Sequence, residues 1–480
     1  MKSMGLHGLA STALVCAALL LISSGILAAD QPAAKPNVLF VAIDDLRDWV
    51  GYLGRNPQTS TPNIDKLAAR GVRFTRSYCA APVCNPSRAA LMSGLRPSTS
   101  GVYENGNDWR TAISQDLPLT TTFRKAGYLV FGAGKIYHGA YPRRAEWDDY
   151  LEIEGRDPQP TGDTGVGGIK FAPLDCKDDD LREWKIVQYG IDQLQKKHGQ
   201  PFFLAVGLHK PHMPWNVPRK YYDKHPLEKI QLPLTPKDDL ADLPPAGVLM
   251  ARPEGDHRKI LEANRWKNAV QGYLAAISYC DAMVGRLMDA FDKSAYRDKT
   301  IIVFWSDHGW HLGEKEHWRK FALWEEATRA PLIWIVPDLT KPNSVCDRTV
   351  DFMTIYPTLT DLCGIPTPKH VQGASIRNLL QNPQSAWDTP ALTTYRFGNH
   401  AVRTEGWRYI RYQDGGEELY DKTKDPNEWT NLADKPEFKG RKAELARHLP
   451  KDNHPEVGKR AGKEAGDVIK PNKPSAQKSK

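Results

Sequence analysis

Cysteine is scarce in this chain, and its spacing excludes several classes of protein. Seven cysteines occur among 480 residues, and no two of them form a CxxC pair or have the spacing of a zinc finger. The sequence therefore predicts neither a small disulfide-stapled domain nor a zinc-binding module. Six cysteines remain after the first 29 residues, and an exported protein could pair some of them.

Long apolar runs are absent beyond residues 1–29, where one early lysine precedes an apolar stretch from Leu9 to Ile22 and small residues follow. This order predicts a cleaved export signal, with Ala28 or Ala29 as its last residue. A membrane anchor is the alternative, but Ser and Gly interrupt the run, which is short for a membrane span. We therefore expect an exported protein, periplasmic or secreted, with no stable membrane insertion.

A basic stripe is also lacking, although the formal net charge is +8. Residues 451–480 hold eight Lys or Arg and four Asp or Glu, and we expect them to form a disordered basic tail. Residues 30–450 carry only +3, without the clustered basic and aromatic side chains that are typical of nucleic-acid binding. No nucleic-acid partner is expected.

Four short apolar runs are present, and each ends abruptly in charged or imidazole side chains. They are NVLFVAIDD (37–45), YLVFGAGKIYH (128–138), PFFLAVGLHKPH (201–212) and TIIVFWSDHGWHLGE (300–314). Such runs are typical of parallel strands that are buried on both faces. Helical patterns lie between them, from Thr61 to before Gly71 and again over 269–291.

This alternation predicts an α/β fold with a doubly wound sheet flanked by helices. Near residue 385 the pattern changes, and polar residues alternate with aromatic ones around the DGG sequence at 414–416, which indicates an antiparallel hairpin. We expect a main α/β domain over 30–385 and a small antiparallel-sheet subdomain over 386–450.

The ends of the four predicted strands should meet in one cleft, because functional groups collect beyond the carboxyl ends of parallel strands. Asp44, Asp45, Asp307 and His308 would lie there. An oxygen-rich set of this kind suits a hard divalent cation better than zinc. Each Asp alone is better explained by a helix cap or a loop hydrogen bond. Two acidic strand ends in one cleft are costly without a cation, so together they predict a metal site.

Cationic groups should join this cleft, and they suit an anionic ester with several terminal oxygens. The candidates are Arg88, Lys135, His138, His209 and Lys320. A histidine among them could protonate the departing alkoxide. A lone lysine is more often a surface residue, and Lys320 by its local sequence would lie on the surface of a helix.

The role of Cys84, in CNPSRAALMSG (84–94), stays open on the residues alone. A thiolate is a poorly matched ligand for a hard cation. A disulfide with Cys79 is awkward, because only four residues, one of them Pro82, intervene.

The sequence from Cys84 to Arg88, Cys-Asn-Pro-Ser-Arg, resembles the Cys-x-Pro-Ser-Arg signature of type I sulfatases, whose cysteine is oxidised to formylglycine. Other segments are similar to that family and follow its order over residues 36–435: TPNIDKLAARGVRFTRSY, SGLRPSTSGVY, GAGKIYH, SDHG and WEEATRAPL. The resemblance implies an alkaline-phosphatase-like fold with a mixed, mostly parallel sheet. It also implies that a hydrated aldehyde at residue 84 attacks sulfur through one hydroxyl and later expels sulfate through the other.

The resemblance further implies one calcium ion per chain and a partner enzyme that generates the formylglycine. The calcium ligands would be Asp44, Asp45, Asp307 and His308, with the modified Cys84 completing the set. Arg88 would stabilise the formylglycine and the sulfate, Lys135 and Lys320 would bind sulfate oxygens, and His138 and His209 would serve the nucleophile and the leaving group.

His308, together with GLHKPHMPW and SDHGWHLGE, most resembles the iduronate-2-sulfatase branch, because arylsulfatases commonly have Asn or Asp at that position. The branch removes the 2-O-sulfate of a uronic acid within a glycosaminoglycan. A carboxylated sugar would explain Lys210 and His212 near the cleft, although strand-end structure explains them equally well. Ser93 and Leu95 stand where many members have Thr and Arg, which could lower the efficiency of maturation.

Two other functions fit the same scaffold. One is hydrolysis of phosphonate or phosphate monoesters, since the charge demands at phosphorus and sulfur are similar. The other is non-catalytic carbohydrate binding, which predicts an unmodified Cys84. Related bacterial enzymes desulfate algal polysaccharides, so the expected substrate class is a sulfated oligo- or polysaccharide.

Overall fold

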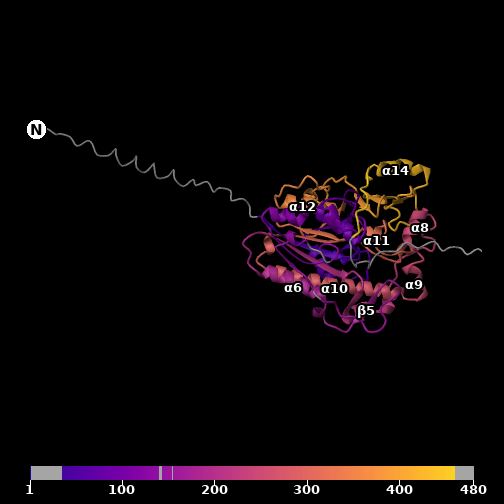
Figure 1. Ribbon diagram of the computed structural model, residues 1–480, viewed down its shortest axis with the longest axis horizontal. Helices are drawn as coiled ribbons and strands as arrows, with labels where there is room; N and C mark the ends of the chain where they lie inside the picture. The colour runs from indigo at the N-terminus through magenta and orange to yellow at the C-terminus, as the bar shows by residue number, and fades with distance from the viewer. Residues whose placement is uncertain (2–34, 140–142, 154, 460–480) are drawn as a thin grey trace, which may run out of the picture. The chain divides into compact units, whose positions relative to one another are not determined.

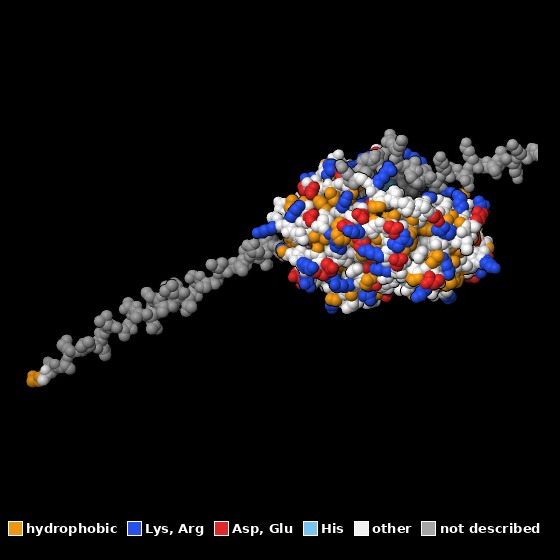
Figure 2. All heavy atoms as spheres, turned by 90° about the horizontal axis from the view of Figure 1, so that it is seen from below, with side chains coloured by type: hydrophobic (Ala, Val, Ile, Leu, Met, Phe, Trp, Pro, Cys, Tyr) orange, Lys and Arg blue, Asp and Glu red, His pale blue; other side chains and the backbone are white. Residues whose placement is uncertain are grey.

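The computed structural model describes Met1 and residues 35–139, 143–153 and 155–459. The expected export signal and residues 460–480 of the expected tail lie outside the described residues. Within the described residues, no helix has the length and the apolar character needed to cross a membrane. Basic and acidic side chains are interspersed over the face that Figure 2 shows.

An eight-stranded sheet lies at the centre of the fold, in the order β12-β2-β11-β8-β1-β6-β3-β4. Its strands are β1 (Asn37–Asp44), β2 (Val72–Tyr78), β3 (Leu129–Gly134), β4 (Asp149–Leu151), β6 (Phe202–Pro211), β8 (Thr300–Ser306), β11 (Leu332–Ile335) and β12 (Ser344–Asp351). Every strand runs in the same direction except β11, which is antiparallel to β2 and β8. The prediction of a mixed, mostly parallel sheet is confirmed.

Strand β1 shows why these sequences form central strands. All eight of its residues are buried, and it pairs in parallel with β6 on one side and β8 on the other. Its apolar side chains alternate between the faces, with Leu39 and Val41 in one core cluster and Val38 and Phe40 in the other. A run of apolar residues is needed because both faces are covered.

Helices cover both faces of the sheet, as Figure 1 shows for α6 and α10 on one side and α12 on the other. The first core cluster is completed by α6 (Arg182–Gln195) and α10 (Trp266–Asp292), and the second by α2 (Cys84–Ser93), α5 (Leu119–Lys125) and α12 (Ile355–Leu362). The helix expected over 269–291 is confirmed and begins three residues earlier. The other helices are α1 (Pro62–Ala68), which confirms the helix expected after Thr61, α3 (Pro97–Ser100), α4 (Trp109–Ala112), α7 (Arg219–Tyr222), α8 (Pro245–Ala251), α9 (Asp256–Glu262), α11 (Glu325–Thr328), α13 (Arg377–Gln381) and α14 (Lys439–Ala446).

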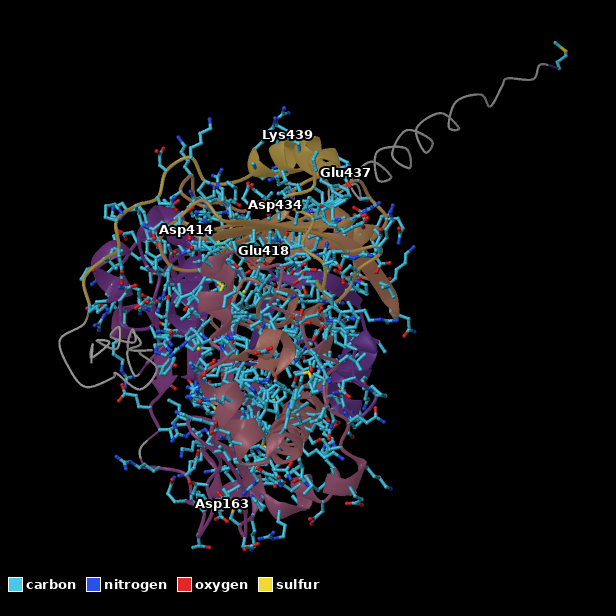
Figure 3. The ribbon with its side chains drawn as sticks, turned by 90° about the vertical axis from the view of Figure 1, so that its right-hand side faces the viewer. Asp163, Asp414, Glu418, Asp434, Glu437 and Lys439 are labelled. Carbon is cyan, nitrogen blue, oxygen red and sulfur yellow. The ribbon has the colours of Figure 1, made fainter. Side chains whose placement is uncertain are left out.

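A separate four-stranded antiparallel sheet follows near the C-terminus, as the hairpin pattern predicted. It contains β13 (Ala391–Thr394), β14 (His400–Arg403), β15 (Trp407–Arg411) and β16 (Glu417–Asp421) in chain order. Figure 3 shows this sheet next to α14, with Asp414 in the turn of the hairpin and Glu418 on the side that faces the main sheet. Two short pairs complete the strands: β5 (Phe171–Leu174) with β7 (Trp215–Pro218), and β9 (His311–Leu312) with β10 (Trp318–Arg319).

The chain continues in an ordered path past residue 450, where the tail was expected to begin. The backbone N–H of His454 donates to the carbonyl oxygen of Ser98 at 2.7 Å, and that of Val457 donates to Gly101 at 3.0 Å. Residues 451–459 therefore pack against the main domain. The basic composition of residues 451–480 did not predict these backbone hydrogen bonds.

A buried ion pair network joins the two sheets. Arg408 of β15 is 1% exposed and lies 2.6 Å from a carboxylate oxygen of Glu325 on α11. Its guanidinium also donates to Glu428 and to the carbonyl oxygen of Leu323. Removing one partner of such a network leaves an uncompensated buried charge.

We predict that Arg408→Met destabilises the protein by roughly 3–5 kcal/mol, because Glu325 and Glu428 lose one of their buried cations. Arg403 and Lys422 remain as partners of these carboxylates. Arg258→Ala is the matched control, since its side chain is 54% exposed and forms only surface pairs with Glu254 and Glu262; it should cost less than about 1 kcal/mol. Urea denaturation followed by tryptophan fluorescence measures both. Equal losses in the two variants would contradict the role assigned to the network.

Candidate active site

The site lies at the carboxyl ends of four adjacent parallel strands, β8, β1, β6 and β3. Because neighbouring parallel strands end at the same edge of the sheet, the polar residues that follow them are brought together. These residues are Asp307 and His308 after β8, Asp44 and Asp45 at the end of β1, His209 and Lys210 among the last three residues of β6, and Lys135 and His138 after β3.

Five buried side chains at this edge could hold a metal ion. Asp44, Asp45, Cys84, Asp307 and His308 each offer one ligand atom, and these atoms all lie within 4.8 Å of one another. The Nε2 atom of His308 is 3.4 Å from Oδ1 of Asp45 and 3.6 Å from Oδ1 of Asp307. Three carboxylates and one imidazole form a donor set that fits a divalent cation with a preference for oxygen.

The electrostatics of the cluster also favour added positive charge. Burial raises the pKa of Asp45 to about 8 against the opposing charge of Lys320, and the neighbouring carboxylates of Asp44 and Asp307 raise it further. Burial alone would raise the pKa of Asp44, but the charge of Lys135 and smaller contributions from other basic groups hold it well below its usual range. Asp45 is thus the carboxylate whose ionisation a cation would stabilise most.

Cys84 is the first residue of α2 and is completely buried. Its Sγ atom lies 3.1 Å from Nζ of Lys320 and 3.3 Å from Nε2 of His308. Burial, followed by the carboxylate of Asp44, raises the pKa of the Cys84 thiol well above its usual range, so the unmodified side chain would be a weak nucleophile at neutral pH. Cys79 and Cys84 are both free thiols, so the disulfide between them is not formed.

Arg88 lies one helical turn after Cys84 and is fully buried. Its Nε donates to Oδ2 of Asp307 at 2.8 Å, and its NH2 group donates to the carbonyl oxygen of Ile43 at 3.1 Å. The NH1 group donates to the carbonyl oxygen of Lys135. The guanidinium therefore connects the ends of β8, β1 and β3 to the helix that carries Cys84.

The two lysines reach the cluster from different kinds of segment. Lys135 follows β3 and its ammonium pairs with Asp44. Lys320 is 2% exposed, lies between β10 and α11, and pairs with Oδ1 of Asp45 at 3.0 Å. Its interpretation as a helix-surface residue is wrong. The loop turns inward at this point because Arg319 and Phe321 adopt φ values of 76° and 77°, which no helix contains.

His138 and His209 border the cluster from β3 and β6. Burial and the charge of Lys135 lower the pKa of both rings, to about 3 for His209 and well below the usual range for His138. Nδ1 of His138 is buried and has no hydrogen-bond partner among the described residues. Nδ1 of His209 is 4.0 Å from the carboxylate of Glu183, a buried residue of α6.

Lys210 and His212 differ in their surroundings. The ammonium of Lys210 donates to the carbonyl oxygen of Pro214 at 2.6 Å, and the residue is 5% exposed. This geometry favours the strand-end interpretation of Lys210. Nε2 of His212 lies 3.8 Å from Oδ2 of Asp45, so this ring belongs to the edge of the cluster.

Three supporting residues were not predicted as site residues, although one of them, Ser87, lies within the Cys-Asn-Pro-Ser-Arg sequence. The hydroxyl of Tyr273 donates to the carbonyl oxygen of Asp45 at 2.7 Å and accepts from the backbone N–H of Arg47 at 3.0 Å. Ser87 donates to the carbonyl oxygen of Asp307 at 2.6 Å, and Glu183 lies beside His209. Tyr273 occupies an ordinary apolar position of α10, so nothing in the helical pattern distinguishes it from core residues.

Comparison with known proteins identifies the family. Residues 36–365 match the sulfatase family, and residues 313–454 match the C-terminal region of N-sulphoglucosamine sulphohydrolase. A sulfatase of Formosa agariphila is 39% identical over 448 residues, covering 87% of each chain. The iduronate 2-sulfatase of Mus musculus is 30% identical over 468 residues, covering 78% of this chain and 84% of its own.

A solved structure shows the same fold at lower identity. The phosphonate monoester hydrolase of Silicibacter pomeroyi superposes with a TM-score of 0.73 at 21% identity, covering 86% of this chain and 94% of its own. The family matches and the close relatives extend over both the main sheet and the C-terminal sheet. The chain therefore belongs to the sulfatase family, whose members hydrolyse sulfate esters.

Proposed function

We propose that this protein is an exported, calcium-dependent sulfatase that removes the 2-O-sulfate of a uronic acid within a sulfated polysaccharide, with Cys84 oxidised to formylglycine. The position of Cys84 carries the proposal. Its side chain projects from the start of α2 into a buried cluster of carboxylates, where Lys320 and His308 lie within 3.3 Å of it. The export signal proposed for residues 1–29 would place the enzyme where extracellular polysaccharides are degraded.

The proposed calcium ion would be held by Asp44, Asp45, Asp307 and His308, with the oxidised side chain of residue 84 beside it. Bound there, the ion would supply positive charge to the sulfate oxygens. Calcium accepts mixed carboxylate ligands in flexible geometry, which suits a set of side chains that come from two strand ends.

When Cys84 is oxidised, the hydrated aldehyde supplies the hydroxyl that attacks sulfur. The start of α2 assists at this position, because the free N–H groups of a first helical turn stabilise negative charge. Lys135 and Lys320 would bind the sulfate oxygens, and both already point at the cluster through Asp44 and Asp45. Arg88 would stabilise the site through the carboxylates and carbonyl groups to which it donates.

His209 is proposed as the proton donor to the departing sugar oxygen, and His138 as the partner of the nucleophile. The lowered pKa values keep both rings neutral at pH 7 in the free protein. A bound sulfate ester brings negative charge that raises the pKa of a neighbouring imidazole. Glu183 favours His209 for the donor role, because its carboxylate lies 4.0 Å from Nδ1 and would stabilise the imidazolium.

Maturation must occur before the chain completes its fold. Cys84 has no exposed surface, so a formylglycine-generating partner enzyme cannot reach its thiol in the folded protein. The segment CNPSR, which forms the start of α2 in the folded protein, would be presented to that enzyme in an extended conformation.

We predict that native material contains a peptide across residue 84 that is lighter than the cysteine form by the difference between CH2SH and CHO. Cys84→Ser should abolish sulfate ester hydrolysis without unfolding the protein. Cys176→Ser is the matched control, because Cys176 is a half-buried thiol in a different part of the fold, and it should retain activity. Peptide mass spectrometry and a rate assay measure these outcomes; an unmodified Cys84 in fully active enzyme would refute the role.

The proposed substrate rests on the mouse iduronate 2-sulfatase relative and on His308, which the sequence shares with that branch. A phosphonate or phosphate monoester hydrolase is the second candidate, because the phosphonate monoester hydrolase of Silicibacter pomeroyi has the same fold. The two candidate functions share one fold and differ in the atom that is attacked, sulfur or phosphorus. Hydrolysis rates on sulfate and phosphate esters must therefore distinguish them.

We predict that kcat/KM for a 2-O-sulfated uronate disaccharide exceeds that for a 6-O-sulfated glucosamine disaccharide by roughly 100-fold or more, since misplacement of the reacting group by a small distance is this costly. The 2-O-phosphate of the same disaccharide is the control for the reacting atom. Initial rates on the three substrates give the result. Preference for the 6-O-sulfate would overturn the sugar assignment, and faster phosphate hydrolysis would favour the second candidate.

A further inference from the structure

A second hollow, which we call the junction hollow, lies between the main sheet and the C-terminal subdomain. The volume of the junction hollow is about 160 Å³. Its walls come from segments far apart in the sequence and include Arg47 and Arg55 after β1, Leu234, Glu314, Glu326 of α11, and Trp429 after β16. Junctions between parts of a fold are common positions for ligand sites.

Among the described residues, the basic and acidic side chains that line the junction hollow are equal in number, and none of these basic side chains lacks an acidic partner. Three basic and three acidic side chains contribute to it, and each basic group already has an acidic partner. The pairs are Arg47 with Glu314 at 2.6 Å, Arg55 with Asp48 at 3.1 Å, and Lys315 with Asp239 at 2.6 Å. A sulfate or carboxylate group would therefore have to break an ion pair to bind, whereas a neutral polar ligand would not.

Glu326 is the acidic group that remains without a partner. Its side chain is 93% buried, since the residue is 7% exposed, and its carboxyl makes no hydrogen bond with the described residues. The carboxyl oxygens of Glu326 are not completely enclosed by protein, so water or a ligand in the hollow can reach them. Because Glu326 lines the junction hollow, a group inside the hollow can satisfy it. Burial and the neighbouring Glu314 raise the pKa of Glu326 to about 7, so the carboxyl can either accept or donate a hydrogen bond.

Apolar side chains at the mouth of the junction hollow supply a second kind of contact. Trp429 is 37% exposed and Leu234 is 75% exposed. The other tryptophan of the lining, Trp49, has the guanidinium of Arg47 over its ring at 4.6 Å. Trp429 is therefore the indole that can offer a face to a ligand in the hollow that Glu326 also lines.

From this combination we infer that the junction hollow binds one neutral pyranose residue, separately from the Cys84 cluster. The apolar C–H face of the sugar ring packs on Trp429, and its hydroxyl groups hydrogen-bond to Glu326 and to Asn427, another lining residue. The hollow is open to solvent on one side, so a single ring can extend beyond the 160 Å³ that the walls surround. The site goes beyond sulfate hydrolysis, because it would anchor an unsulfated sugar of a polysaccharide.

Saturation-transfer difference NMR on the whole protein tests this inference, with the methyl glycosides of glucose, galactose and mannose as probes. At least one glycoside should bind, with the strongest transfer to its ring C–H protons. Trp429→Ala should weaken this binding by roughly tenfold or more, equal to about 1.4 kcal/mol, and Glu326→Gln should weaken it as well. Phe397→Ala is the matched control, since Phe397 is an aromatic residue with 39% exposure elsewhere on the surface, and it should bind as the wild type does.

Two further measurements keep the test independent of the proposed function. Hydrolysis of a small aryl sulfate should be the same in Trp429→Ala and in the wild type, which shows that the variant is folded. Added inorganic sulfate should leave the glycoside signal unchanged. The inference fails if no glycoside binds, if Trp429→Ala and Phe397→Ala behave alike, or if sulfate displaces the sugar. Loss of all sulfatase activity in the wild type would refute the proposed function and leave the sugar-binding result intact.

Discussion

The guanidinium of Arg88 is the interaction on which the active site depends. Arg88 and Cys84 are four residues apart in α2, so they lie on the same face of the helix. While Cys84 projects into the carboxylate cluster, Arg88 donates to Asp307, to the carbonyl oxygen of Ile43 and to that of Lys135. The helix that carries the proposed nucleophile is thereby fixed to three strand ends at once, which is the precision that the proposed catalysis requires.

Charge balance is the second constraint. Three carboxylates lie close together in a buried space, where their negative charges would repel one another if no positive charge were nearby. Arg88, Lys135 and Lys320 offset the negative charge only in part, since burial, and after it the carboxylates of Asp44 and Asp307, still raise the pKa of Asp45 to about 8. The proposed calcium ion would supply the missing positive charge, and the same charges would then be arranged around the oxygens of a sulfate ester. Arg88, Lys135 and Lys320 would thus serve both the stability of the cluster and the proposed catalysis.

The sequence predicted the sheet and most of the cluster, because local patterns determine both. Apolar runs identified β1, β3, β6 and β8, and the position of a residue just after a parallel strand predicted its presence at the common edge. Lys320 could not be placed by that logic, since it reaches the cluster through positive φ values at Arg319 and Phe321. Tyr273 and Glu183 were missed because helical periodicity marks them only as inward-facing, and the path of residues 451–459 depends on tertiary contacts that no local pattern encodes.

Calcium binding to metal-stripped protein is the most direct measurement of the central claim, that the strand ends form one site for a divalent cation. Isothermal titration calorimetry should show one calcium ion per chain, and Asp307→Asn should weaken its affinity by about tenfold or more, because a charged ligand is lost. Asp256→Asn, which removes a carboxylate paired with Arg319 outside the cluster, should bind calcium as the wild type does. Absence of calcium binding, or equal affinity in both variants, would contradict the account.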